Sequence, residues 1–177
     1  LLASAGNNLA NSGLIDAGNR LDLLAGNNLT NKTAGIIAGR DISLTATGGD
    51  VLNERTVSSH NSSNGYRTER TDFVDNAARI EAANNLTLQA GRDVNSVGSL
   101  IKSGADTTIK AGRDVNLVAS EQRNSQVAGT LSRGDSTTQY GSVVEAGRDF
   151  KIVAARDISA IASQIDAARD IAMAASG

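Results

Sequence analysis

The sequence Ala111-Gly112-Arg113-Asp114-Val115-Asn116-Leu117 is the clearest copy of a motif that recurs along the whole chain. The motif joins a small residue, a polar residue, Asp or Asn, and then a branched apolar residue. A turn residue followed by alternating apolar and polar residues is typical of the start of a β-strand. The closest copies, Ala-Gly-Arg-Asp or Ala-Ala-Arg-Asp, begin at Ala38, Ala90, Ala111, Ala146, Ala154 and Ala167. Looser copies begin at Gly6, Gly18, Gly26 and Ala83.

The spacing of these motifs predicts the architecture. When one equivalent position of each motif is used as a marker, short gaps of 8 or 9 residues alternate with long gaps of 12 or 13. One short and one long gap together give a unit of about 21 residues, as from Asp93 to Asp114 and from Asp149 to Asp170. Two gaps of 35 residues keep the same phase, because 35 is 13 plus 22. A fixed period of this length indicates a solenoid.

We therefore predict an all-β fold, a parallel β-solenoid in which one unit forms one coil and coils stack about 4.8 Å apart. In the unit that begins at Asp93, strands are expected over residues 93–97, 100–102 and 107–110. The inward side chains are expected to include Val94, Ile101, Ile109, Val115 and Leu117. Corners are expected at Gly98, Gly104 and Gly112, where a positive φ angle would favour glycine.

Two other folds are compatible with parts of this pattern. Leucine-rich repeats also have units of 20 to 29 residues, but they need several Leu per unit and a helical or 3₁₀ segment. The coils here carry one or two Leu each. Residues 154–176 are rich in Ala and have good helix propensity. The 13-residue step between Asp157 and Asp170 continues there, so we favour strands in that segment as well.

The composition fits a single thin-cored domain. The chain has 177 residues with two Phe, two Tyr and no Trp, which makes an ordinary globular core improbable. It has no Pro, as expected where every coil must donate backbone hydrogen bonds. A net charge of −2 does not indicate binding to nucleic acid or anionic membranes. The lack of Cys excludes disulfides and thiolate metal sites, and no apolar run approaches the ~18 residues of a membrane span.

The two 35-residue gaps predict insertions. Each contains two polar arms of β-forming residues around a Ser-, Asn- or Gly-rich tip, which indicates hairpins at about residues 53–76 and 119–144. They follow Asp50 and Asp114, so they should leave the same side of the rod two coils apart, roughly 10 Å, and could pair. The alternative is that each insertion is one degenerate coil of about 22 residues. We favour hairpins because the arms lack small corner residues.

The corner residues predict ladders along the rod. Asn7-Asn8 and Asn27-Asn28 could hydrogen-bond to one another up the stack, or could simply tolerate left-handed turn geometry. Arg92 and Arg113 are 21 residues apart and should stack, with neighbouring Asp residues offsetting their repulsion. We expect a solvated charged edge in which each exposed pair contributes no more than ~1 kcal/mol.

No catalytic, cofactor-binding or metal site is predicted. Nearly every Asp belongs to a recurring corner motif, which explains it without catalysis. The single histidine, His60, falls in a predicted hairpin tip and is expected to be a bystander. Gly48-Gly49-Asp50 matches a fragment of a Ca²⁺-binding nonapeptide repeat, but that chemistry needs tandem copies and this one occurs once.

One short motif is a candidate receptor contact. Arg133, Gly134 and Asp135 spell the tripeptide that host integrins recognise, and they fall in the predicted tip of the second hairpin. An exposed tip is where such a ligand should lie. Against this, the motif is only three residues long and is made of residues that are common in the chain.

The repeats resemble those of filamentous haemagglutinin-type exoproteins of two-partner secretion, a group that includes the contact-dependent growth inhibition exoproteins. The matching segments are residues 75–95, which contain Ala-Ala-Asn-Asn-Leu-Thr-Leu-Gln-Ala-Gly-Arg-Asp-Val-Asn, and residues 109–117. The resemblance implies a right-handed parallel β-helix. It also implies export across a Gram-negative outer membrane by a partner transporter, and a location that is secreted or on the bacterial cell surface. Because the repeat already runs at residue 1 and no polar cap ends it, we expect residues 1–177 to be an internal segment of a longer exoprotein.

The expected function is structural and not enzymatic. The segment would be part of a stiff filament that carries a receptor-binding or toxin-delivery module away from the cell. The main alternative is direct adhesion, in which the hairpins contact a receptor on a target or host cell. A role in passing cargo through a target cell's outer membrane is implied by the resemblance alone, and a carbohydrate-active β-helix enzyme is the remote alternative.

Overall fold

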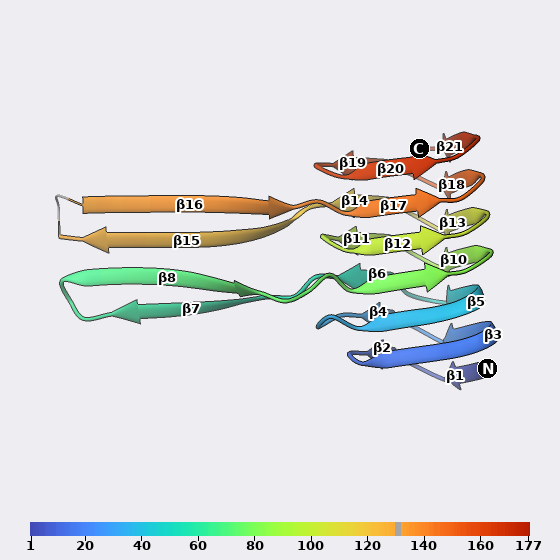
Figure 1. Ribbon diagram of the computed structural model, residues 1–177, viewed down its shortest axis with the longest axis horizontal. Helices are drawn as coiled ribbons and strands as arrows, with labels where there is room; N and C mark the ends of the chain where they lie inside the picture. The colour runs from blue at the N-terminus through green and yellow to red at the C-terminus, as the bar shows by residue number, and fades with distance from the viewer. Residues whose placement is uncertain (130–131) are drawn as a thin grey trace.

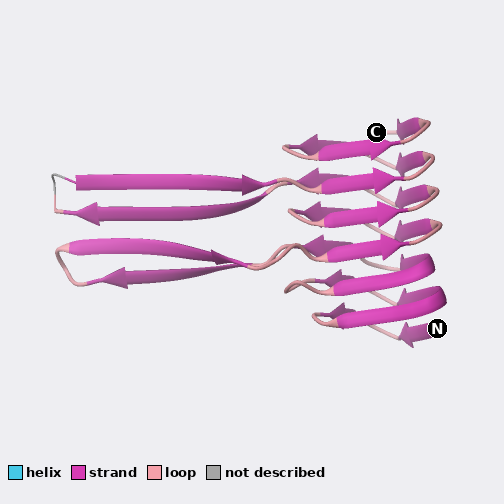
Figure 2. Ribbon diagram, viewed as in Figure 1, coloured by secondary structure: helices cyan, strands magenta, loops and turns pink. Residues whose placement is uncertain are grey.

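A computed structural model describes residues 1–129 and 132–177. In this part of the chain all regular structure is β, with 21 strands and no helix. The strands wind into a stack of coils, and two long hairpins project from one side of the stack (Figure 2). The helical and leucine-rich alternatives are therefore wrong, and the Ala-rich residues near the C-terminus are strands like the others.

From β9 onward, each complete coil contains three short strands joined by tight corners, and each strand stacks in parallel on its counterpart in the next coil. In one coil these are β11 (Val94–Val97), β12 (Leu100–Ser103) and β13 (Thr107–Ala111), which confirms the predicted division. In Figure 1 the chain runs from left to right on the near side, returns on the far side and rises toward the C-terminus. The solenoid is therefore a right-handed parallel β-helix.

The coils build three flanks. The first contains β9 (Arg79–Ala82), β12, β17 (Val143–Ala146) and β20 (Gln164–Ala167). The second contains β1 (Leu2–Ala5), β10 (Leu86–Ala90), β13, β18 (Phe150–Ala154) and β21 (Ile171–Ala175). The third contains β2 (Leu9–Asn11), β4 (Leu29–Asn31), β6 (Val51–Glu54), β11, β14 (Val115–Val118) and β19 (Ile158–Ile161). Two long strands, β3 (Leu14–Ala25) and β5 (Ile36–Ala46), bend from the first flank into the second and join these flanks into one sheet.

The core consists of columns of identical or similar side chains, because equivalent residues of successive coils pair in parallel register. Leu88 pairs with Leu44 below it and with Ile109 above it, and Ile152 continues the column. All four side chains are fully buried. The five inward positions predicted from the sequence, Val94, Ile101, Ile109, Val115 and Leu117, are all buried. Removal of such a side chain from water contributes about 1.5–3 kcal/mol, and only the neighbouring coils provide that burial.

The corner glycines serve two different purposes. Gly98 has a φ angle of +55° and needs the left-handed freedom that we expected. Gly104 and Gly112 have no positive φ, so the expected reason is wrong for them. A Cβ atom added to either residue would lie 2.2 Å from a backbone oxygen of the preceding coil, that of Ala83 or Gly91. Close approach between coils is the reason for glycine at these two corners.

Both insertions are extruded antiparallel hairpins, so the degenerate-coil alternative is wrong. The first is β7 (Val57–Ser63) with β8 (Arg67–Val74), and the second is β15 (Ser120–Ala128) with β16 (Ser132–Tyr140). They leave the rod after β6 and β14, on either side of the coil that contains β11 (Figure 1). β8 also pairs with β15, antiparallel over four residue pairs, to give a four-stranded sheet in the order β16-β15-β8-β7. The two hairpins therefore pair with each other, as their spacing in the sequence allowed.

Candidate functional site

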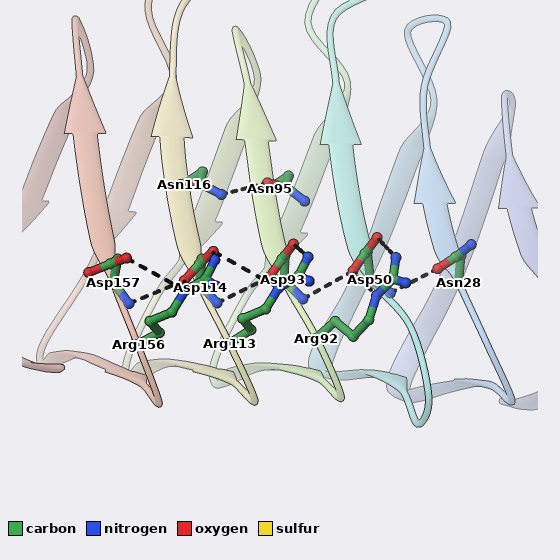
Figure 3. A network of polar contacts seen from close by, with 10 residues as sticks. All are labelled: Asn28, Asp50, Arg92, Asp93, Asn95, Arg113, Asp114, Asn116, Arg156 and Asp157. Atoms are coloured by element: carbon green, nitrogen blue, oxygen red, sulfur yellow. Dashed lines mark hydrogen bonds and ion pairs between the residues drawn. The ribbon is translucent and has the colours of Figure 1, made fainter. Parts of the chain in front are cut away.

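Aspartates form a continuous ladder at the corner between the second and third flanks. Asp50, Asp93, Asp114 and Asp157 lie in a row, one in each of four consecutive coils (Figure 3). The backbone N–H of each later Asp donates to Oδ1 of the Asp one coil earlier, over 3.1, 3.1 and 3.2 Å. One carboxylate per coil therefore holds the turn of the next coil in place.

The arginines of the motif complete this ladder across coils. The Nε and Nη2 atoms of Arg92 donate to Asp50, those of Arg113 to Asp93 and those of Arg156 to Asp114. Each guanidinium thus forms a two-pronged pair with the carboxylate of the preceding coil. Its sequence neighbour is a weaker partner, since Arg113 Nε lies 4.0 Å from Asp114 Oδ2. The sequence analysis expected these Arg residues to pair with Asp, and they do. The structure shows that the partner is the Asp of the preceding coil.

A second ladder lies at the corner between the first and second flanks. Arg148 donates to Asp106 and Arg169 to Asp149 in the same two-pronged way. Lower in this ladder, Asp41 accepts from the side chain of Asn84 at 2.7 Å. From Arg113 to Arg169, the Arg-Asp motif therefore joins each coil to the previous one at two of its three corners. Arg40 of the first copy lies 3.7 Å from its own neighbour Asp41, and Asn side chains link the N-terminal coils.

The ladders keep their carboxylates ionised. Hydrogen bonding from Arg113 lowers the pKa of Asp93 below its usual 3.8, although partial burial opposes the shift. Hydrogen bonding from Arg156 and from Arg92 lowers the pKa of Asp114 and of Asp50 in the same way. A lowered pKa in the folded state means that the ionised carboxylate stabilises the fold.

The stability of the rod should therefore fall in acid. The contribution of the ladders is present above the ordinary carboxylate pKa near 3.8 and is lost as the pH falls through the lowered folded-state values. We expect the thermal midpoint to be level above about pH 5 and to fall steadily below about pH 4. Calorimetry across this range measures it. A midpoint that does not change between pH 5 and pH 2 would contradict the role of the ladders.

Asparagines also form ladders, but the corner Asn residues do so differently from our expectation. Asn8 and Asn28 accept hydrogen bonds from the backbone N–H of Asn28 and Asp50 in the next coil, at 3.0 and 2.9 Å. They act as uncharged versions of the ladder Asp. The amide-to-amide ladder lies elsewhere, where Asn11 donates to Asn31 and Asn31 donates to Asn53 at 2.8 and 2.9 Å. The sequence signal for it was available, because these residues are 20 and 22 positions apart.

The bases of the two hairpins are joined by Arg55. Its Nε donates to the carbonyl of Gly98 at 2.9 Å, and its Nη1 donates to the carbonyl of Asp75 at 2.8 Å. Its guanidinium carbon lies 4.7 Å from the centre of the Tyr140 ring, a cation–π contact. One side chain therefore connects the first hairpin, the coil between the hairpins and the last strand of the second hairpin.

A buried carboxylate connects the hairpins farther out. The side chain of Asp72 in β8 is only 1% exposed and accepts from Arg70 Nε at 3.0 Å and from the backbone N–H of Arg123 in β15 at 2.8 Å. In return, Asn124 Oδ1 accepts from the backbone N–H of Asp72 at 3.0 Å. Hydrogen bonds from Arg70, then from Ser59, lower the pKa of Asp72 to about 2. These side chains replace backbone pairing where β8 and β15 diverge.

Replacement of Asp72 by Ala should uncouple the hairpins and leave the coils folded. The substitution removes the acceptor for the Arg123 N–H and the partner of Arg70. We expect faster hydrogen exchange at Arg123 and in the β8–β15 pairing, with unchanged exchange in β11 and β13. Asp135→Ala is the matched control, because Asp135 also pairs with the Arg two residues before it, Arg133, but its hydrogen bond stays within β16. Equal effects of the two variants would contradict this role for Asp72.

The candidate receptor motif lies in a strand and not at the hairpin tip. Arg133, Gly134 and Asp135 are in the first half of β16 and pair with Ser125–Val127 of β15, so their expected place in the turn is wrong. Residues 130–131 lie outside the described residues. The side chains of Arg133 and Asp135 are 76% and 44% exposed and pair with each other, Nε to Oδ2 at 3.0 Å. The three residues are accessible, but in an extended conformation.

The other residues that the sequence analysis discussed, His60 and Asp50, lie in a strand and in the Asp ladder. His60 lies in β7 and not in the hairpin tip, and Asp50 is bound by Arg92. The described residues contain no group of three His, Cys, Asp or Glu side chains placed to hold a metal ion. None of the described elements is a helix able to cross a membrane. A hollow of about 310 Å³ lies on the hairpin sheet, over β8, β15 and β16 near Gly134.

Comparisons with known proteins agree with this architecture. A sequence model of the hemagglutinin repeat matches residues 57–133 and 129–177, which is more than half of the chain. No curated protein matches the chain. No solved structure matches it either.

Proposed function

Because the chain belongs to the hemagglutinin-repeat family, we propose that it is a rigid filament segment of a large bacterial exoprotein that is secreted or displayed at the cell surface. The family supports a filamentous haemagglutinin-like exoprotein. Adhesin and toxin-delivery stalk are the two forms of that role. The observation that carries the proposal is the pair of corner ladders that join successive coils, built from Arg–Asp pairs between Arg92 and Arg169 and from Asn side chains nearer the N-terminus.

The rigidity follows from how the coils are joined. Parallel backbone pairing on three flanks, buried columns such as Leu44–Leu88–Ile109–Ile152, and the two corner ladders all run along the axis. Each coil therefore adds a fixed rise of about 4.8 Å and cannot bend without breaking several interactions together. Such a rod projects an attached module to a distance set by the number of coils.

Deletion of one whole unit tests this proposal. Residues 21–41 form one unit, because Arg20 is the register partner of Asp41 and Leu21 is the partner of Ile42. Their removal should leave the rod folded and shorter by one coil, about 4.8 Å. Removal of residues 21–31 alone breaks the phase and should disrupt the N-terminal coils. Circular dichroism and small-angle scattering measure both variants, and equal disruption by both deletions would contradict the additive rod.

A second candidate function is direct adhesion through the hairpin sheet. The observation that favours it is the exposure of this sheet, which stands away from the rod and contributes nothing to the core columns (Figure 1). The coil between the hairpins shows how each hairpin can be removed. In that coil the two residues Gly98 and Ser99 join β11 directly to β12, at the corner where the coils on either side carry a hairpin. Gly-Ser can replace residues 55–78 in one variant and residues 119–142 in another. Loss of target-cell binding with an intact rod would support adhesion, and unchanged binding would exclude it.

A further inference from the structure

The strand β16 forms one edge of the hairpin sheet. Among the described residues it pairs only with β15, and its other side faces outward (Figure 1). It is nine residues long, and all but Tyr140 are exposed. The edge is therefore as long as the strand that it pairs with and is open over its full length.

The hydrogen bonds at the hairpin tips fix which backbone groups point outward. The N–H of Gly129, just after β15, donates to the carbonyl of Tyr66 at the end of the first hairpin, at 3.0 Å. The N–H of Arg123 also points toward β8. Odd-numbered residues of β15 thus face β8, and even-numbered ones face β16, where they pair with even-numbered partners such as Thr138. By alternation, the N–H and C=O groups of β16 that point outward belong to Arg133, Asp135, Thr137 and Gln139.

This edge lacks most of the features that usually protect edge strands. Natural edges carry Pro, charged side chains (Lys above all) or a bulge, or are short. The charged side chains of β16, Arg133 and Asp135, pair with each other. The chain has no Pro, and residues 120–140 contain no Lys. The register between β15 and β16 is continuous over nine pairs, so no bulge twists the edge away. The coils of the rod, in contrast, satisfy their backbone groups with one another.

We propose that the outer edge of β16 binds an extended segment of a partner protein by β-strand addition. A row of outward N–H and C=O groups that repeats every second residue is matched by another extended polypeptide. Arg133 and Asp135 are two positions apart, so their side chains lie on one face of the strand. Their charges select complementary charges at the facing positions of the partner segment. An antiparallel partner would place an acidic residue opposite Arg133 and a basic residue opposite Asp135. Its sequence would therefore contain a basic residue, any residue and an acidic residue, in that order.

The opposite edge of the sheet is a built-in comparison. β7 has seven residues, and its pairing with β8 leaves Val57, Ser59, Asn61 and Ser63 as its outward positions by the same alternation. None of these residues is charged, and Ser59 Oγ already accepts from Arg70 at 3.0 Å. The partner segment should therefore prefer β16 to β7.

A synthetic peptide tests the proposal directly. The probe is acetyl-Thr-Val-Lys-Thr-Glu-Val-Thr-amide with a fluorescent label, and binding to the chain is measured by anisotropy. Thr137→Pro removes an outward N–H but no hydrogen bond to β15, so it should weaken binding by about tenfold or more. Thr137→Ala keeps the N–H and should stay within about twofold of the wild type, as should Asn61→Pro on the other edge. Peptide should slow hydrogen exchange at Arg133, Asp135, Thr137 and Gln139, whereas exchange at Gly134, Ser136 and Thr138, which pair with β15, should be slow even without peptide.

Three results would overturn the proposal. The first is no binding at millimolar peptide, and the second is binding that Thr137→Pro leaves unchanged. The third is self-association of the chain that Thr137→Pro abolishes, which would assign the edge to a second copy of the chain. The proposal extends the adhesion alternative by naming the class of partner. Its failure would leave the filament role untouched, because the unit deletion tests that role without any peptide.

Discussion

Replacement of Ile109 by Asp is expected to unfold the coils around it. Ile109 is fully buried in the column between Leu88 and Ile152, so the new carboxylate would have no partner and no water. An unpaired buried charge costs several kcal/mol, even after the group takes up a proton or the site relaxes. That cost is a large part of the 5–15 kcal/mol by which a domain of this size is stable. Ile109→Ala should be milder, with a loss of about 2–5 kcal/mol.

The neighbouring residue supplies the control for this prediction. Thr108 belongs to the same strand but points to the outside, so Thr108→Asp should change stability by no more than about 0.5 kcal/mol. Urea unfolding followed by circular dichroism measures all three variants. Similar stability of Ile109→Asp and Thr108→Asp would mean that β13 does not present Ile109 to a closed core.

Replacement of Gly98 by Val should release the second hairpin from the rod. Gly98 has a φ angle of +55°, which costs strain in a β-branched residue, as it does at Thr33, a β-branched residue with the same φ angle. A Cβ atom there would lie 2.6 Å from Ser120 Cβ and 3.0 Å from the carbonyl oxygen of Tyr140. Both groups belong to the base of the second hairpin. Strain and overpacking together should cost roughly 2–4 kcal/mol and move β15 and β16 away from the coil.

Other turns of the rod help to separate the strain of the positive φ angle from the steric clash with the second hairpin. Ala34 and Ala162 have φ angles of +57° and +50°, so the rod tolerates alanine in this conformation. Gly98→Ala should therefore report the clash with Ser120 and Tyr140 with little contribution from φ. Gly134→Val is the control for adding a side chain near the hairpins, because nothing lies within 4 Å of its Cβ position. Hydrogen exchange in β15 that is unchanged in Gly98→Val would contradict the account.

The coil could be predicted from the sequence because it depends on spacing alone. A 21-residue period with two marked corners, together with a third corner at Gly98, divides the unit that begins at Asp93 into three strands, and the inward positions follow from alternation. Each of the five predicted inward residues is buried for this reason. The hairpins were predictable in the same way, because two gaps exceeded the period while the phase was preserved.

The contacts between coils and between hairpins were not predictable in the same detail. Whether Arg113 pairs with Asp114 beside it or with Asp93 below it depends on the shape of the corner, which spacing does not define. Asp72 and Arg55 occur once each and belong to no repeated motif, so periodicity gave no signal for their roles. The sequence analysis placed Arg133-Gly134-Asp135 in the hairpin tip, whereas these residues lie in β16. The position of a hairpin tip depends on how many residues form the turn, and the sequence on either side of the tip does not define that number.

Disulfide cross-linking tests the central claim most directly, because the chain has no cysteine of its own. Thr87 and Thr108 are register partners in adjacent coils, with Cα atoms near the 4.8 Å that separates neighbouring strands. The double variant Thr87→Cys/Thr108→Cys should therefore form a disulfide readily under mild oxidation, within the Cα separation that such a bond allows. Thr87→Cys/Lys110→Cys shifts one partner by two residues, beyond about 7 Å, and should not cross-link. Equal cross-linking of both pairs, or a preference for the shifted pair, would contradict the stacking of each 21-residue coil on its predecessor.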